Sequence, residues 1–443
     1  MNRKIYILVL VIFSLLLSVI GPVSGQSTVQ TPYIGMWISA WELESLPMSG
    51  AAWTSMLAAA NGSAGSPNIK DQENQNDVLV LAKALVYART GDTKYRGEVI
   101  SNLKAAINTE NGGRTLALGR NLVSYVIAAD LVNLPLNDPV FHTTFSNWLR
   151  AVRSETLDGR TLISTHEDRP NNWGTHAGAS RAAVAIYLED EVDLARTALV
   201  FSGFLGDRSK YSEFNYGDLD WQCDQSSPVG INPDGCTVQG VDIGGSLPEE
   251  MRRAGSFTNP PLETGYAWEA MQGILVQSLL LHRAGFKPFQ WSDEAILRAV
   301  EYLIRVGWQP EGDDVTSMLL VNYIFDTNYF EDIPTIPAKN IGWTDWTHGT
   351  HDLMDVEGGS ISTPNVPVTT APATATVIAP FTATVIAPFT ATPTALSPIT
   401  ATPTVLVTNT PIAATTEAPS ALTFCLEVIM TDPPTSSVVP CNN

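Results

Sequence analysis

A short segment near the middle of the chain gathers side chains that can act as a base and bind an anion. It runs from His166 to Arg181 and reads HEDRPNNWGTHAGASR. Pro170 predicts a break before a helix. If that helix begins near Asn172, then Asn172 and His176 stand at positions i and i+4 and share one face. Amide, imidazole and guanidinium groups therefore converge in the way a catalytic site requires.

Each of these residues also has a structural interpretation. Asn172 is a suitable helix N-cap, Trp173 a suitable core residue, and His176 a suitable buried imidazole with satisfied hydrogen bonds. Taken singly, these interpretations are the more common ones. Their coincidence in one short segment favours a functional site.

A second segment combines arginines with a tyrosine further along the chain. It reads LPEEMRR and ends in Arg252 and Arg253, and it is followed by Tyr266 and Trp268 at the start of a helical pattern. The functional interpretation places an arginine and the tyrosine in one cleft. The structural alternative is a solvated arginine pair and a core helix face.

Together the two segments resemble the alginate lyase superfamily. In that family an Asn-Asn pair precedes a helix bearing the catalytic histidine, and a Leu-Pro-x-Glu-x-x-Arg stretch precedes a catalytic tyrosine. Here Trp173 follows the amide pair and His176 lies one helical turn later. The matching positions of the second stretch are Leu247, Pro248, Glu250 and Arg253, with Tyr266 as the tyrosine. The resemblance extends from about Asp71 to Gly307.

The resemblance implies an α/α toroid that cleaves uronate polymers by β-elimination without a redox cofactor, and we expect neither a cofactor nor a bound metal. Removing the proton beside a uronate carboxylate builds a dianion. Asn171 or Asn172, with Arg253, would stabilise that charge by hydrogen bonds. His176 or Tyr266 would take the proton as general base, and Tyr266 would protonate the departing glycosidic oxygen.

The same resemblance implies residues that hold the neighbouring sugars of an anionic polysaccharide. Arg169 and Arg252 would contribute charge, and Trp173 and Trp268 would contribute stacking surfaces. Buried packing is the alternative role for the tryptophans.

The pattern around these segments predicts an all-α body of antiparallel helical hairpins. Residues 76–89 place apolar side chains at helical spacing and stop at Gly91, a typical C-cap residue. Short joins between successive helices indicate hairpins. The other predicted helices are residues 95–107, 118–134, 141–152, 177–188, 191–201, 265–284, 292–306 and 316–325.

The longest irregular stretch, residues 206–261, contains two of the four cysteines. Pairing Cys223 with Cys236 and Cys425 with Cys441 needs the least loop closure among the three possible schemes. Such a loop is usually functional, and it can also contain a small β element.

The ends of the chain differ in composition from this body. Residues 1–25 predict a cleaved signal peptide, with a retained membrane anchor as the alternative. A cleaved signal implies export to the periplasm, cell surface or medium, with no membrane span afterwards. Residues 31–354 form the predicted toroid domain. Residues 360–420 form a Thr/Ala/Pro-rich, low-complexity linker, and 421–443 a short terminal segment.

The formal net charge of −20 excludes a typical nucleic-acid-binding protein. An acidic surface also repels an anionic polymer. A uronate substrate therefore requires a cleft that concentrates the arginines locally.

Two other functions fit the sequence. A glycoside hydrolase on a similar toroid needs two carboxyl groups, which Asp218, Asp220, Glu263 and Glu269 can supply. A non-catalytic glycan-binding surface protein would keep the toroid without the base.

The segment after residue 340 has two interpretations. His348, His351 and Asp352 can bind a metal, but ligand spacing alone is weak evidence. The more common role of such a segment is docking through its tryptophans, Trp343 and Trp346.

Overall fold

The computed structural model describes residues 35–329, 337–349, 424–429 and 435–440. The chain divides into two units, Met1–Val366 and Pro367–Asn443. In the second unit, strand β3 (Phe424–Ile429) pairs antiparallel with β4 (Thr435–Pro440). The predicted signal peptide, the low-complexity linker and the Cys425–Cys441 pairing lie outside the residues whose side chains are described.

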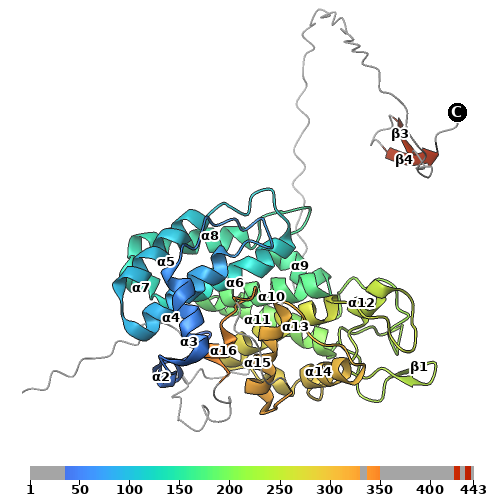
Figure 1. The fold of residues 1–443 in the computed structure, drawn as a ribbon. Coiled ribbons are helices and arrows are strands. Elements are labelled where there is room, and N and C mark those ends of the chain that lie inside the picture. Colours follow the sequence, from blue (N-terminus) through green and yellow to red (C-terminus); the bar gives the residue numbers. More distant parts are fainter. Residues whose placement is uncertain (1–34, 330–336, 350–423, 430–434, 441–443) are drawn as a thin grey trace, which may run out of the picture. The chain divides into compact units, whose positions relative to one another are not determined.

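A row of five helices forms the interior of the first unit. In chain order each packs against the next, and α6 is buried along its whole length. Figure 1 shows α6, α10 and α13 near the middle of this unit. The five are α4 (Asn76–Thr90), α6 (Thr115–Leu131), α10 (Asn172–Tyr187), α13 (Tyr266–Arg283) and α15 (Asp314–Phe325).

A second set of helices covers the interior row. Two of them pack on α4, one packs on α10 and one on α13, while α8 packs on α5. Alternation of outer and inner helices along the chain gives the antiparallel hairpins of an all-α toroid, which confirms the predicted fold class. The outer helices are α3 (Gly50–Asn61), α5 (Thr93–Ala106), α8 (Pro139–Val152), α11 (Glu191–Leu205) and α14 (Ala295–Arg305).

Short helices fill the joins. They are α2 (Ala40–Ser45), α7 (Leu134–Asn137), α9 (Leu162–Asp168), α12 (Pro248–Met251) and α16 (Thr344–Thr347), with 3-10 turns η1 (Arg252–Ala254) and η2 (Pro288–Gln290). The nine helices predicted from periodicity are all present, with ends shifted by a few residues. The largest shift is at α10, which begins at Asn172 rather than at residue 177.

Local signals account for the helix ends. Gly91 closes α4 in the left-handed conformation, with φ of 73°, and its N–H bonds to the Tyr87 carbonyl. Asn171 caps α10 by accepting a hydrogen bond from the Trp173 N–H. A capping box between Thr161 and Ser164 starts α9.

Glycines allow the inner helices to approach one another closely. A Cβ atom at Gly119 of α6 would lie 2.9 Å from the Ala177 nitrogen of α10. One at Gly273 of α13 would lie 2.5 Å from the Thr175 carbonyl carbon. Any larger residue at either position would push α10 away from its neighbour.

The segment 337–349 docks into the helical unit. Trp343 and Trp346 are buried, and their ring nitrogens donate to the carbonyls of Val78 and Pro47. Helix α16 contacts both α15 and α3. These contacts favour the docking role, and the residues that the structure describes contain no group of side chains suited to a metal. His351 and Asp352 lie outside those residues.

The long join between α11 and α13 contains the predicted disulfide and a small β element. Cys223 and Cys236 are bonded, with their Cα atoms 5.5 Å apart, which confirms this pairing. Strands β1 (Thr237–Val238) and β2 (Val241–Asp242) form a two-residue ladder beside it. No helix within the described ranges has the length and apolar character needed to cross a bilayer.

Candidate functional site

The inner helices all begin at the same end of the ring. Asn172, the first residue of α10, contacts the first turn of α13 through Glu269. Arg120 in the second turn of α6 contacts Asp313, which precedes α15. We call this end the mouth; it comprises residues 72–73, 114–120, 169–173, 250–253, 266–269 and 313–314. Helix N-termini carry partial positive charge, so their convergence favours anions there.

Three arginines and two aromatic rings line one part of the mouth. The Arg253 guanidinium carbon lies 4.1 Å from the centre of the Tyr266 ring. The corresponding distances to the Trp173 ring are 4.3 Å for Arg169 and 5.5 Å for Arg114. We call these five residues the basic arc.

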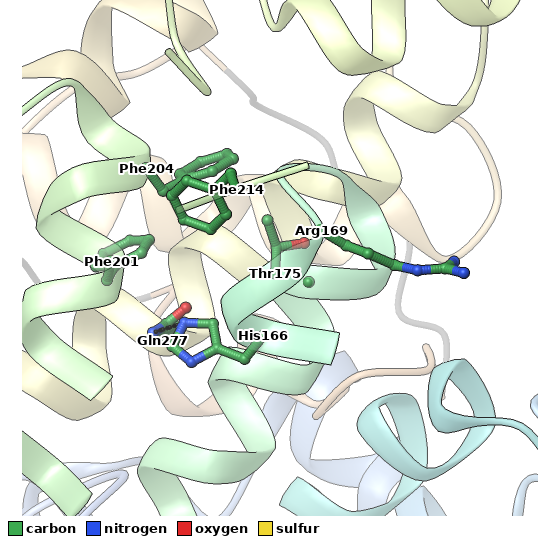
Figure 2. A pocket seen from close by; sticks show the side chains of 8 residues that line it. His166, Arg169, Thr175, Phe201, Phe204, Phe214 and Gln277 are labelled. Atoms are coloured by element: carbon green, nitrogen blue, oxygen red, sulfur yellow. Dashed lines mark hydrogen bonds between the residues drawn. The ribbon is translucent and has the colours of Figure 1, made fainter. Parts of the chain in front are cut away.

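The basic arc keeps its positive charge. None of its three arginines forms an ion pair with any residue in the described part of the chain, although Arg114 donates to the Gln72 side chain. Burial, with the like charges of Arg160 and Arg253, lowers the pKa of Arg169. Figure 2 shows the Arg169 side chain extending away from the buried cavity behind it. An acidic protein thus carries a local concentration of guanidinium groups.

Asn172 joins the two sequence segments that were predicted to share a cleft. Its backbone N–H donates to Glu250 Oε1, and its side-chain Nδ2 donates to Glu269 Oε2 at 2.8 Å. Its Oδ1 accepts from the Trp173 N–H at 2.9 Å. Asn172 therefore holds the first turns of α10 and α13 together, and its amide is occupied by that task.

Asn171 is the more available of the two amides. Its Oδ1 accepts from the Trp173 N–H at 3.1 Å as the helix cap. Its Nδ2 makes no hydrogen bond within the part of the chain that is described. Of the pair, Asn171 can therefore offer an N–H group to a ligand.

His176 lies inside the ring rather than at the mouth. It is 1% exposed, and burial together with the charges of Arg120 and Lys339 holds its pKa well below the ordinary value. It is therefore a neutral imidazole behind the wall formed by α6 and α13. The predicted role of His176 as a base that touches substrate does not fit this burial.

Two of the predicted substrate-binding residues are also occupied elsewhere. Trp268 is 2% exposed and belongs to the core. Arg252 is paired with Glu249 through bonds of 2.9 and 2.7 Å. The structure leaves Arg169, Trp173, Arg253 and Tyr266 accessible at the mouth, and Tyr266 is 42% exposed.

Carboxylates line the rest of the mouth. The buried guanidinium of Arg120 lies 2.9 Å from Asp313, 3.4 Å from Glu73 and 3.8 Å from Glu269. We call Glu73, Glu269, Asp313 and Asp314 the acidic arc. Burial raises the pKa of Asp314 to about 8, assisted by the charges of Asp313 and Glu269.

Glu250 is a buried carboxyl group beneath the basic arc. Burial raises its pKa to about 8, although the Asn172 N–H and the Arg253 charge both favour the ionised form. At neutral pH it is therefore mostly protonated, and it leaves the Arg253 charge uncompensated. In the sequence, only its place in the Leu-Pro-x-Glu-x-x-Arg stretch indicated that Glu250 belongs to the site. No sequence pattern indicated that Asp313 and Asp314 belong to it.

The carboxylates considered for a hydrolase are only partly at the mouth. Glu269 is there, while Asp218 and Glu263 are exposed and Asp220 is half-buried in the join between α11 and α13.

A small cavity behind the mouth is structural. It is lined by His166, Gln277, Thr175 and three phenylalanines (Figure 2). The His166 imidazole is buried, contacts Gln277 Nε2 at 3.2 Å and Arg181 at 3.4 Å, and has a pKa well below its ordinary value through burial.

Comparisons with known proteins find a likeness to solved structures. No family model matches the chain, and no curated protein matches it. Among solved structures, an alginate lyase from Bacteroides ovatus aligns at 14% identity with a TM-score of 0.42. The alignment covers 63% of this chain and 75% of that one. A likeness at this level carries no inference about activity.

Proposed function

We propose that this protein is a polysaccharide lyase that cleaves a uronate-containing, alginate-like polysaccharide by β-elimination. The observation that carries the proposal is the basic arc: three unpaired guanidinium groups stacked on two aromatic rings, at the end of the ring where the inner helices begin. Guanidinium groups match carboxylate geometry, and aromatic rings provide flat surfaces for sugars.

In the proposed reaction Arg253 and the Asn171 amide bind the uronate carboxylate. Their hydrogen bonds stabilise the negative charge that builds up when the neighbouring carbon loses its proton. Protonated Glu250 leaves the Arg253 charge fully available for this purpose. Asn172 acts as a positioning residue, because it fixes Glu250 and Glu269 relative to α10.

Tyr266 is the proposed base and acid. As the phenolate, its oxygen takes the proton from C5 of the uronate. The electron pair forms the C4–C5 double bond while the C4–oxygen bond breaks. The proton then passes from Tyr266 to the departing glycosidic oxygen, which balances the step. Arg169 and Trp173 hold an adjoining sugar.

We also propose that the protein is exported. The disulfide between Cys223 and Cys236 is typical of an oxidising compartment. The predicted signal peptide would direct the chain there and be removed.

The test is the formation of unsaturated product. The protein is incubated with a panel of uronate polysaccharides while ultraviolet absorbance is followed. Tyr266→Phe is expected to lose about 10²- to 10⁴-fold in turnover. Tyr87→Phe is the matched control, because Arg96 lies 5.6 Å from that ring at the other end of α4. Absence of unsaturated product from every polymer would contradict the proposal.

A glycoside hydrolase is the second candidate, favoured by one observation. Asn172 contacts two carboxyl groups, Glu250 and Glu269, and burial raises the pKa of the first to about 8. Hydrolysis needs a pair of carboxyl groups, one of which is protonated and acts as the acid. Saturated reducing sugars without ultraviolet absorbance would identify this activity.

A further inference from the structure

One part of the mouth is positively charged and another part is negatively charged. This arrangement limits which sugars can be neighbours in the substrate. The basic arc and the acidic arc are connected through side-chain contacts. Arg114 of the basic arc donates to Gln72 at 2.8 Å, and Gln72 donates to Glu73 of the acidic arc at 3.1 Å. The two arcs are therefore parts of one rim.

The acidic arc is also adjacent to the proposed catalytic tyrosine. Tyr266 and Glu269 stand at i and i+3 on α13, so they share a face of the helix. Three residues of helix advance about 4.5 Å, close to the length of one sugar ring. Glu269 of the acidic arc therefore lies less than one helical turn from Tyr266 along α13.

The charge of the acidic arc is only partly neutralised. Arg120 is the one cation paired with Glu73, Glu269 and Asp313 within the described residues. The side chains of Glu73 and Asp313 are 65% and 35% exposed. Three carboxylates facing one buried guanidinium leave an excess of negative charge at the surface.

Asp314 gives an independent indication that this part of the rim meets a polar group of a ligand. It is 7% exposed, and its Oδ1 has no hydrogen-bond partner among the described residues. Its electrostatic neighbours are Asp313, Glu269 and Arg120, which places it within the acidic arc. Buried polar atoms of this kind are normally satisfied.

We infer that the substrate is a heteropolymer in which each uronate is followed by a sugar without negative charge, such as a hexosamine. This inference rests on the proposed β-elimination at a uronate, and it replaces an alginate-like chain of successive uronates by a heteropolymer as the substrate. The basic arc binds the uronate, and the acidic arc accepts hydrogen bonds from the hydroxyl, amide or ammonium groups of the next sugar. A second uronate at that position would be repelled by Glu73 and Asp313.

The test compares binding of short oligosaccharides by calorimetry with Tyr266→Phe, so that none is consumed. One set is a homopolyuronate, one alternates uronate with N-acetylhexosamine, and one is the latter after removal of the acetyl groups. We expect the alternating set to bind on the order of tenfold more tightly than the homopolyuronate. Tighter binding after deacetylation would identify an ammonium contact, and equal binding would identify hydroxyl donors.

Glu73→Gln, in the same background, is the specificity variant. It removes one exposed negative charge, so the homopolyuronate should bind more tightly. The ratio of the affinities for the alternating oligosaccharide and the homopolyuronate should therefore fall several-fold. Glu191→Gln is the matched control, because Glu191 is an exposed carboxylate at the start of α11, at the opposite end of the ring.

Two results separate this inference from the proposed function. Equal or tighter binding of the homopolyuronate, or a preference that Glu73→Gln leaves unchanged, overturns the inference even if the native protein is a lyase. The expected preference without unsaturated product from any polymer overturns the lyase proposal and supports the selectivity of the rim.

Discussion

Replacing Glu250 by glutamine should increase the free energy of unfolding relative to that of the native protein, and this difference should grow as the pH rises. The carboxyl group is fully buried, and its pKa is raised from 4.5 to about 8. Above pH 4.5 the unfolded chain releases this proton while the folded chain retains it. The unfolded state then binds fewer protons, so the native protein loses stability as the pH rises, until the folded group ionises near pH 8.

The size of the effect follows from the shift. Between about pH 5 and about pH 8 the linkage amounts to about 3–4 kcal/mol for one group with these two pKa values. Glutamine keeps the Oε1 atom that accepts the Asn172 N–H and carries no titratable proton. The unfolding free energy of Glu250→Gln, minus that of the native protein, should therefore increase by about that amount over this pH interval.

Urea unfolding followed by tryptophan fluorescence at several pH values measures this difference. Subtracting the two proteins cancels the titration of all groups that they share. Glu191→Gln, on the exposed end of α11, should give a flat difference. A flat difference for Glu250→Gln as well would refute the assignment of a neutral buried carboxyl and with it the argument that Arg253 is left uncompensated.

Three further predictions concern the mouth and its support. Arg253→Lys should lower kcat/KM by about 10²-fold or more, because lysine lacks the planar fork that binds a carboxylate; wild-type rates would contradict its role. His176→Ala should lower the unfolding free energy by about 2–4 kcal/mol. It should reduce kcat of the folded fraction by less than about tenfold, whereas loss of a catalytic base would reduce kcat by about 10²-fold or more. Cys223→Ser should cost about 3 kcal/mol in the chain-entropy account, and thermal unfolding of the native protein with reductant should show the same loss; unchanged melting would show that the bond contributes nothing.

Local sequence signals were sufficient for the helices but not for every side chain's environment. The apolar spacing of residues 76–89 and the stop at Gly91 are properties of one segment, and α4 follows them. The burial of His176 could not be predicted from its own segment. Its spacing from Asn172 correctly placed both on one helix, but α10 is covered by α6, α9 and α13, so the histidine is enclosed. Those covering surfaces come from residues far away in the sequence.

The same reasoning applies to the candidate site. The stretch from Leu247 to Arg253 and the tyrosine at 266 were recognisable as a pattern, and the structure brings Arg253 to the Tyr266 ring. The acidic arc was not recognisable. Glu73, Glu269 and Asp313 meet only because Arg120 lies where three chain segments converge.

The most direct measurement is a crystal structure of Tyr266→Phe with a bound uronate oligosaccharide. The account predicts a sugar carboxylate within hydrogen-bond distance of Arg253, a neighbouring ring against Trp173, and the C5 hydrogen directed at residue 266. An oligosaccharide bound away from the mouth, or one whose carboxylate points away from Arg253, would contradict the account.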